Sequence, residues 1–245
     1  MDELRKSFHH DLEKARGDLA LLAARVVEII PRATSVLLDG DLEGAELVIR
    51  GDAEIDAHAV DVEERCIQIL ALQAPVASDL RQVVALLKMI AEIERSGDLA
   101  ANICKATRRI YGHELDPKLR GIIGRMGEQA ASLYAAAIEA FRENDAAKAA
   151  AVDDMDAYLD ALQKQFIAAI FESQAAGHID LQVAVQLAMV ARFYERIGDH
   201  AVNMAERVTY IVTGKVPDHK KPKRPQVNID SIDDLGAAPG SAEAT

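Results

Sequence analysis

Residues 94–98 read Glu-Arg-Ser-Gly-Asp, and residues 195–199 read Glu-Arg-Ile-Gly-Asp. The offset of 101 residues (from 94 to 195) holds without a gap for further matching residues around both motifs. A shared heptad would reproduce leucine and valine, but it would not reproduce Glu, Arg, Gly, Asp and Asn together. The chain therefore contains an internal repeat. The other matching pairs are Asp79 and Asp180, Leu80 and Leu181, Val84 and Val185, Leu86 and Leu187, Ala100 and Ala201, and Asn102 and Asn203.

The apolar residues along the chain recur at alternating steps of four and three, which is the spacing of packed helices. Half of the residues are hydrophobic, aromatic residues make up only 4%, and tryptophan is absent, as is typical of closely packed helices. Turn signals predict helices that end near residues 39, 72, 112, 144, 174 and 212. The first helix shows the pattern most clearly, with a seam of Phe8, Leu12, Ala15, Leu19, Leu22, Val26, Ile29, Ala33 and Val36.

The predicted fold class is all-α, with six long helices forming two tandem pseudo-repeated three-helix bundles. The first repeat covers residues 1–113 and the second covers residues 114–213. Pro31 lies inside the first helix and is expected to kink it. Prolines interrupt a run of basic residues after position 213, and the chain end is polar and acidic. Residues 214–245 are therefore predicted to form a disordered C-terminal tail.

The charge of the chain limits its partners. The formal net charge of -12 argues against nucleic-acid binding and favours cations or basic protein surfaces as partners. Cys66 and Cys104 lie in apolar stretches and are expected to be reduced core residues. The N-terminus shows no apolar signal region, and the uncharged run at residues 181–191 is too short to span a membrane. We therefore expect a cytoplasmic protein that reaches a membrane only peripherally, through its partners.

Each motif places a stripe of oxygen-bearing side chains on its helix, because residues four apart share one face. These stripes are expected to lie to the side of the packing seam or exposed, and shorter stripes on the second and fifth helices would lie beside them. Oxygen donors of this kind suit hard cations such as Mg, Ca, Mn or ferric iron, and also zinc. The long stripes are Glu94, Asp98 and Asn102, and Glu195, Asp199 and Asn203; the short ones are Asp52 and Asp56, and Asp156 and Asp160.

Several of these residues have a plainer interpretation. Acidic residues on the flank of a helix are often only solvated. Gly97 and Gly198 each cost a helix about 1 kcal/mol relative to alanine, and they indicate either tight helix packing or the close approach of a partner or ligand. Arg95 and Arg196 are expected to donate to the neighbouring carboxylates, and the alternative is that they offer a recognition point for a partner. His58 and His200 lie beside the acidic residues and could each be an additional ligand, but they are interpreted as exposed histidines that bind none.

The sequence lacks the common catalytic motifs. It has no Glu-x-x-His pair of the di-iron type, no Gly-x-x-x-x-Gly-Lys phosphate loop and no Gly-x-Ser-x-Gly. We therefore predict that the protein is not an enzyme and has no catalytic residues. One alternative is a carboxylate-rich metal-dependent enzyme or metal-storage protein, which a turnover assay on phosphate esters with added Mn or Fe would detect. Another is a purely structural scaffold.

Taken together, the motifs resemble those of the PhoU family, over residues 4–213. The resemblance rests on Asp-x-x-Ile-Asp at residues 52–56, on Gln-Ala-Pro-Val-Ala-Ser-Asp-Leu-Arg at residues 73–81, and on the two repeated motifs with their asparagines. The chain departs from the family pattern at Ser96, where isoleucine is commoner. The Pro-Val-Ala-Ser-Asp-Leu-Arg sequence at residues 75–81, which is expected to form a turn, is reduced in the second repeat to His-Ile-Asp-Leu-Gln at residues 178–182.

The resemblance implies a negative regulator of phosphate uptake and of the phosphate-starvation response. It implies an adaptor that binds the ATP-binding subunit of the phosphate ABC importer and a phosphate-sensing histidine kinase, and that forms a homodimer. It also implies bound metal ions (Fe, Mn, Mg or Zn), with Asp153 and Asp154 offering alternative registers on the fifth helix. The implied ligands are Asp52, Asp56, Glu94 and Asp98, then Asp156, Asp160, Glu195 and Asp199, with Asn102 and Asn203 in support.

Overall fold

The computed structural model describes residues 2–216, with the side chains of residues 2–5 left aside. Within that range the chain is all-helical and contains no strand, as predicted. The predicted tail lies outside the described residues from position 217 onward. The helices are α1 (Asp2–Asp39), α2 (Leu42–Gln73), α3 (Ala77–Arg109), α4 (Pro117–Glu143), α5 (Ala146–Ala175) and α6 (Leu181–Thr213).

Aspartate caps begin four of the six helices. Asp41, Asp116, Asp145 and Asp180 each accept hydrogen bonds from backbone N–H groups in the first turn of α2, α4, α5 and α6. These N–H groups have no partner inside the helix, so each cap stabilises its helix by about 1 kcal/mol. The sequence therefore fixes four helix starts through single side chains.

The start of α3 differs from that of α6, although Asp79 and Asp180 match in sequence. The residue before α3, Val76, makes no side-chain capping bond. The turn instead holds Ala74 and Ala77 at φ +44° and +52°. A residue with a Cβ is strained in this left-handed region. The two repeats therefore diverge at the turn that precedes their shared motif.

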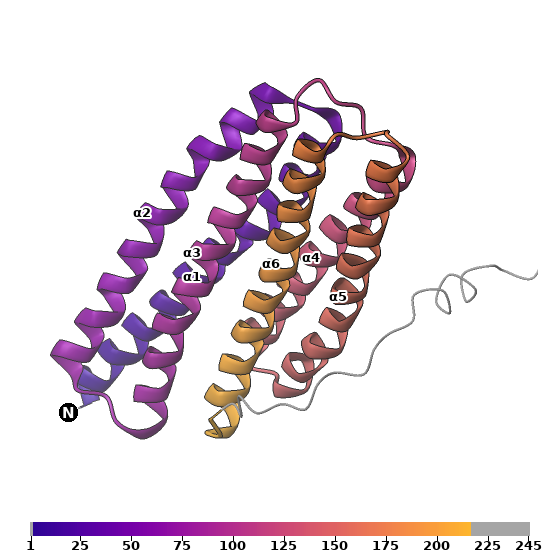
Figure 1. Ribbon diagram of the computed structural model, residues 1–245. Coiled ribbons are helices and arrows are strands. Elements are labelled where there is room, and N and C mark those ends of the chain that lie inside the picture. The colour runs from indigo at the N-terminus through magenta and orange to yellow at the C-terminus, as the bar shows by residue number, and fades with distance from the viewer. Residues whose placement is uncertain (1, 217–245) are drawn as a thin grey trace, which may run out of the picture.

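The six helices form two three-helix units that lie side by side (Figure 1). α1 packs against α4 and α3 packs against α6, so equivalent helices of the two repeats meet. They run in opposite directions, as Figure 1 shows, which gives the molecule an approximate twofold symmetry. α2 and α5 lie at the outer edges, where α2 contacts only α1 and α3 among the described helices.

One hydrophobic core runs through both units, because side chains from all six helices are buried together. α1 continues through Pro31 as a single helix. Its seam runs through Ile30, which is fully buried, while Ile29 is only half-buried. The predicted seam was wrong at this point, because a helix with 3.6 residues per turn drifts away from a strict heptad.

Polar side chains join the two units as well. The hydroxyl of Thr34 on α1 donates to the carbonyl of Ile30 and lies 2.7 Å from the hydroxyl of Tyr194 on α6. Arg16 on α1 donates to the Phe141 carbonyl (3.0 Å) and to Asn144 Oδ1 (2.8 Å) at the end of α4. These bonds fix α1 against α4 and α6 at both ends of the contact.

Candidate functional site

The carboxylates of the first repeat lie where α2 packs against α3. A Cβ on Gly97 would come within 3.3 Å of both Asp52 Oδ1 and Ile55 Cδ1, so the missing side chain leaves room for these two residues. Asp56 and Asp98 are exposed on either side of this contact. Gly97 therefore allows α2 and α3 to pack closely, and it leaves space for the carboxylate of Asp52 between them.

One carboxylate in each of the two short stripes is buried, which the sequence did not predict. Asp52 is only 9% exposed and Asp156 only 1%. Both belong to the helix face that packs on α3 or α6, because they fall in step with buried apolar residues such as Ile55 and Leu159. The exposed carboxylates are Asp56 and Asp98 in the first repeat and Asp199 in the second.

The first-repeat carboxylates repel one another. Burial, the charges of Asp98 and Asp56, and a hydrogen bond with Asp98 raise the pKa of Asp52 to about 6, against the opposing charge of Lys105. Burial, followed by the charges of Asp98 and Asp56, also raises the pKa of Glu94. The four carboxylates therefore share one patch with an excess of negative charge.

Asn102, the last residue of this stripe along α3, already has a hydrogen-bond partner. Its Oδ1 accepts a hydrogen bond of 3.2 Å from Lys105 Nζ. Lys105 was not among the residues selected from the sequence, although it lies one turn beyond Asn102 on the same helix face. The lysine supplies part of the positive charge that the patch lacks.

The second repeat compensates its charge differently. Glu195 forms an ion pair with Arg192, three residues earlier on α6, whereas the repeat-related position on α3 is Ala91. Burial and the charge of Asp199 raise the pKa of Glu195, and Arg192 opposes this rise. Asn203 donates 3.3 Å to Glu92 of the first repeat. The second stripe is therefore partly neutralised by its own chain.

Glu92 and His200 form a polar contact between the two units that the sequence did not reveal. His200 Nδ1 is hydrogen-bonded to Glu92 Oε2, and His200 is only 6% exposed, so its interpretation as an exposed histidine was wrong. Burial alone would raise the pKa of Glu92, but the bonds from His200 and Asn203 and the nearby positive charge of Arg95 lower it below its ordinary value. The only signal in the sequence was the break in the repeat, where Phe193 and Leu99 occupy the related positions.

The first-repeat patch fits a hard cation in the chemistry of its donors. It offers four carboxylates, and Asp52 Oδ1 is buried without a hydrogen-bond partner among the described residues. Such an oxygen is satisfied when a cation binds it. Within residues 2–216, however, no three acidic, histidine or cysteine side chains are placed closely enough to hold a metal ion. The oxygen donors are therefore of the kind that a hard cation binds, but three of them do not lie around one common point.

We expect Asp52→Asn to stabilise the metal-free protein at pH 7 and to lose this advantage in acid. Because the folded-state pKa of Asp52 is raised to about 6, the protonated form favours folding. Its contribution is complete below the unfolded pKa, near 4, and disappears as the pH rises through 6. After a discount for solvent screening, we expect Asp52→Asn to raise the free energy of unfolding at pH 7 by roughly 1 kcal/mol, which corresponds to a few degrees in Tm.

The measurement is Tm between pH 4 and 7 in the presence of a chelator. Asp61→Asn is the control, because Asp61 is exposed on the same helix and its charge is not among those that raise the pKa of Asp52. A Tm difference between Asp52→Asn and the unmodified chain that does not change with pH would contradict the assignment.

Comparison with known proteins agrees with the repeated helical fold. Residues 19–107 and 123–208 match the model of the PhoU domain, once in each repeat. The chain is 34% identical over 215 residues to the phosphate-specific transport system accessory protein PhoU homolog 1 of Mycobacterium tuberculosis H37Rv, covering 87% of this chain and 96% of that protein. It is 35% identical over 218 residues to homolog 2 of the same organism, covering 87% and 100%.

Solved structures give the same result. The phosphate transport system regulatory protein PhoU from Streptococcus pneumoniae superposes with a TM-score of 0.78 at 27% identity, over 86% of this chain and 99% of that one. PhoU from Pseudomonas aeruginosa superposes with a TM-score of 0.80 at 28% identity, over 85% and 100%. Among residues 2–216, no helix combines the length and the hydropathy that a membrane span requires. The repeated domain match and the identity across most of the chain place this protein in the PhoU family.

Proposed function

We propose that this chain is a cytoplasmic accessory protein of phosphate transport that holds phosphate uptake and the phosphate-starvation response in check. Its relatives are named as accessory or regulatory proteins of the phosphate-specific transport system. The described residues form packed helices with an acidic surface patch, and such a surface suits an adaptor that works through protein contacts. The proposed partners are the ATP-binding subunit of the phosphate importer, a phosphate-sensing histidine kinase and a second copy of this chain.

We also propose that the first-repeat patch binds a divalent or trivalent metal ion (Fe, Mn, Mg or Zn). The observation that supports it is the crowding of Asp52, Asp56, Glu94 and Asp98. Burial, followed by the charges of Asp98 and Asp56, raises the pKa of Asp52 to about 6, and the same two charges add to the effect of burial on Glu94. A bound cation would supply the positive charge that these carboxylates lack. The second repeat, with Asp156, Asp160, Glu195 and Asp199, is the weaker candidate, because Arg192 already pairs with Glu195.

Elemental analysis of protein purified without chelators tests the metal proposal. We expect Glu94→Ala with Asp98→Ala to remove most of the metal from the first repeat and to relieve repression of a phosphate-starvation reporter gene at high phosphate. Asp52 and Asp56 alone would leave only half of the carboxylate donors, which is too few for a hard cation. Glu28→Ala with Glu128→Ala, two exposed acids on α1 and α4, is the control.

The two readouts separate the two parts of the proposal. Metal content near zero in every sample would remove the metal site and leave the regulatory role to be judged from the reporter. Unchanged metal content and unchanged repression in the Glu94 and Asp98 variant would reject the assignment of these residues. A deletion of the whole chain that leaves the reporter repressed would reject the regulatory role itself.

A further inference from the structure

The outer face of α2 carries a second apolar pattern that the fold does not use. The helix buries one face against α1 and α3, through residues such as Ile55, Val62 and Ile69. On the opposite face, positions 53, 57, 60, 64, 67 and 71 alternate at steps of four and three, and all six are exposed. We call these residues the outer seam: Ala53, Ala57, Val60, Glu64, Ile67 and Ala71.

The residues of the outer seam have the spacing that allows a second helix to pack along α2. Steps of four and three average 3.5 residues per turn, which keeps a stripe in register with a partner helix. Val60 is 53% exposed and Ile67 is 51% exposed, while the alanines beside them leave space for a close approach. α2 lies at the edge of the molecule (Figure 1), so a helix could lie along it without displacing any described element.

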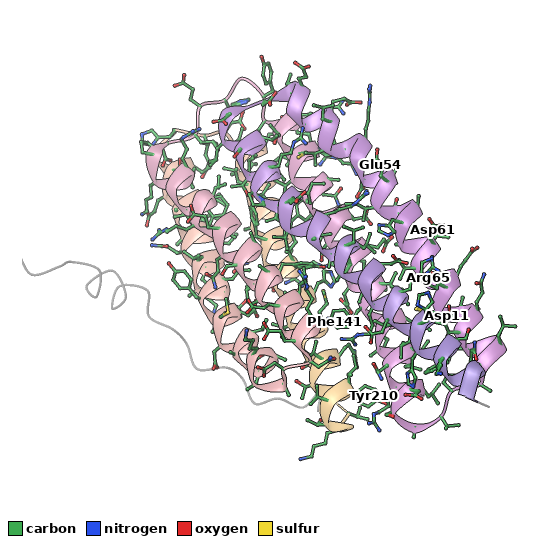
Figure 2. The ribbon with its side chains drawn as sticks, turned by 180° about the vertical axis from the view of Figure 1, so that it is seen from behind. Asp11, Glu54, Asp61, Arg65, Phe141 and Tyr210 are labelled. Carbon is green, nitrogen blue, oxygen red and sulfur yellow. The ribbon has the colours of Figure 1, made fainter. Side chains whose placement is uncertain are left out.

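Acidic residues border the outer seam on both sides. Glu54 and Asp61 lie on the side of α1, where Glu54 is within 3.6 Å of Arg25. Figure 2 shows Glu54, Asp61 and Arg65 following one another along this edge, where the charge of Arg65 is paired with Asp18 of α1 at 3.0 Å. Asp56 and Glu63 lie on the side of α3, seven residues apart on one face. The apolar stripe therefore lies between two acidic borders, and Glu64 adds a charge within it.

We infer that the outer seam is a docking site for a basic amphipathic helix of a partner protein, with an apolar stripe flanked by lysine or arginine. Charge complementarity selects this occupant. A second copy of α2 packed on the outer seam would be unfavourable, because it would bring acidic borders against each other and the charged Glu64 against the apolar Val60. An anionic membrane surface would be repelled. The basic segment of this chain that follows α6 is interrupted by Pro217, Pro222 and Pro225, which a helix interior does not tolerate.

The inference concerns one helix face, and it stands whether or not the metal site and the partners proposed above are correct. It also differs from the acidic patch of the motifs. The patch lies where α2 packs against α3, whereas the outer seam faces away from both neighbouring helices, and the patch shares only Asp56 with the borders of the outer seam. A substitution in the outer seam therefore leaves Asp52, Glu94 and Asp98 untouched.

Binding of synthetic helices to the full chain tests the inference. The probe is a labelled peptide of three heptads with a leucine and alanine stripe flanked by lysine, and fluorescence anisotropy gives its Kd. Control peptides carry glutamate in place of lysine, or the same residues in an order without the stripe. We expect the basic striped peptide to bind at least ten times more tightly than either control.

Variants then place the binding on α2. Val60→Lys with Ile67→Lys is expected to weaken the basic striped peptide at least tenfold, and Glu54→Lys with Asp61→Lys is expected to shift the preference towards the acidic peptide. Leu21→Lys on α1 is the matched control, because Leu21 is 56% exposed but lies outside the outer seam. All of these positions are exposed, so the fold is retained, which circular dichroism checks.

Three results would overturn the inference. Equal binding of the unstriped basic peptide would show non-specific attraction to an acidic protein. Unchanged binding to the Val60 and Ile67 variant would place the site elsewhere. A change from dimer to monomer in that variant, seen by sedimentation, would show that the outer seam is an interface between copies of this chain.

Discussion

Gly127→Ala is expected to lower the free energy of unfolding by roughly 2–3 kcal/mol, and Tm by about 5–10 °C. Gly127 lies on α4 against Thr34 of α1, where an added Cβ would be 2.7 Å from Thr34 Cγ2 and 2.9 Å from Thr34 Cβ. Rotation of the threonine side chain cannot move its Cβ away, so α1 and α4 must separate. That movement would strain the hydrogen bond between Thr34 and Tyr194.

The same helix supplies the control for this prediction. Gly121 and Gly124 have no heavy atom within 4 Å of an added Cβ. Alanine at either position should be neutral or stabilise the protein by up to about 1 kcal/mol, because alanine favours helix. Thermal unfolding of the three variants gives the answer. If the Gly127→Ala variant were as stable as the Gly124→Ala variant, α1 and α4 would not approach each other as closely at Gly127 as the structure shows.

Glu92→Ala is expected to destabilise the protein by about 3 kcal/mol. The substitution leaves His200, which is only 6% exposed, without its carboxylate, and Asn203 without its acceptor. Removing one partner of a buried polar pair costs more than the pair contributed, because the other partner stays desolvated. Denaturant unfolding at pH 7 measures the loss. The pair should also weaken in acid, since the pKa of Glu92 is lowered and its protonation removes the acceptor.

The repeat itself suggests the compensating change. At the repeat-related positions the chain has Phe193 and Leu99, both packed in or against the hydrophobic core. We expect the double substitution Glu92→Phe with His200→Leu to restore stability to within about 1 kcal/mol of the unmodified chain, because apolar side chains replace both partners. Equal losses in the double variant and in the sum of the single variants would show that Glu92 and His200 do not act as a pair.

The helices could be predicted to within a few residues because their signals are local. Asp41 and Asp116 cap helices through bonds to residues only three positions away. The seams follow from the order of apolar residues along one helix. The error at Ile29 came from extending a strict heptad through a helix that turns by 3.6 residues. The left-handed turn at Ala74 and Ala77 was missed because alanine rarely takes that conformation.

The candidate site could be predicted only in part. The sequence selected the ten site residues, and the packing of α2 on α3 does bring the charges of Asp52, Asp56, Glu94 and Asp98 together. It did not predict which of them are buried. Nor did it predict that Lys105 engages Asn102 and that Arg192 engages Glu195. A stripe read along one helix gives the spacing of its members, but it does not show what the neighbouring helix places opposite them.

The order of residues was enough to predict the six helices, the repeat of the Glu-Arg-x-Gly-Asp motif and the resemblance to the PhoU family. The burial of Asp52 and Asp156, and the contact of Glu92 with His200 across 108 residues of chain, became visible once the helices were packed. Helix periodicity and capping are local, because they depend on residues within one or two turns. Burial and the pairing of polar groups depend on which helix faces come into contact, and that is decided by the packing of the whole chain.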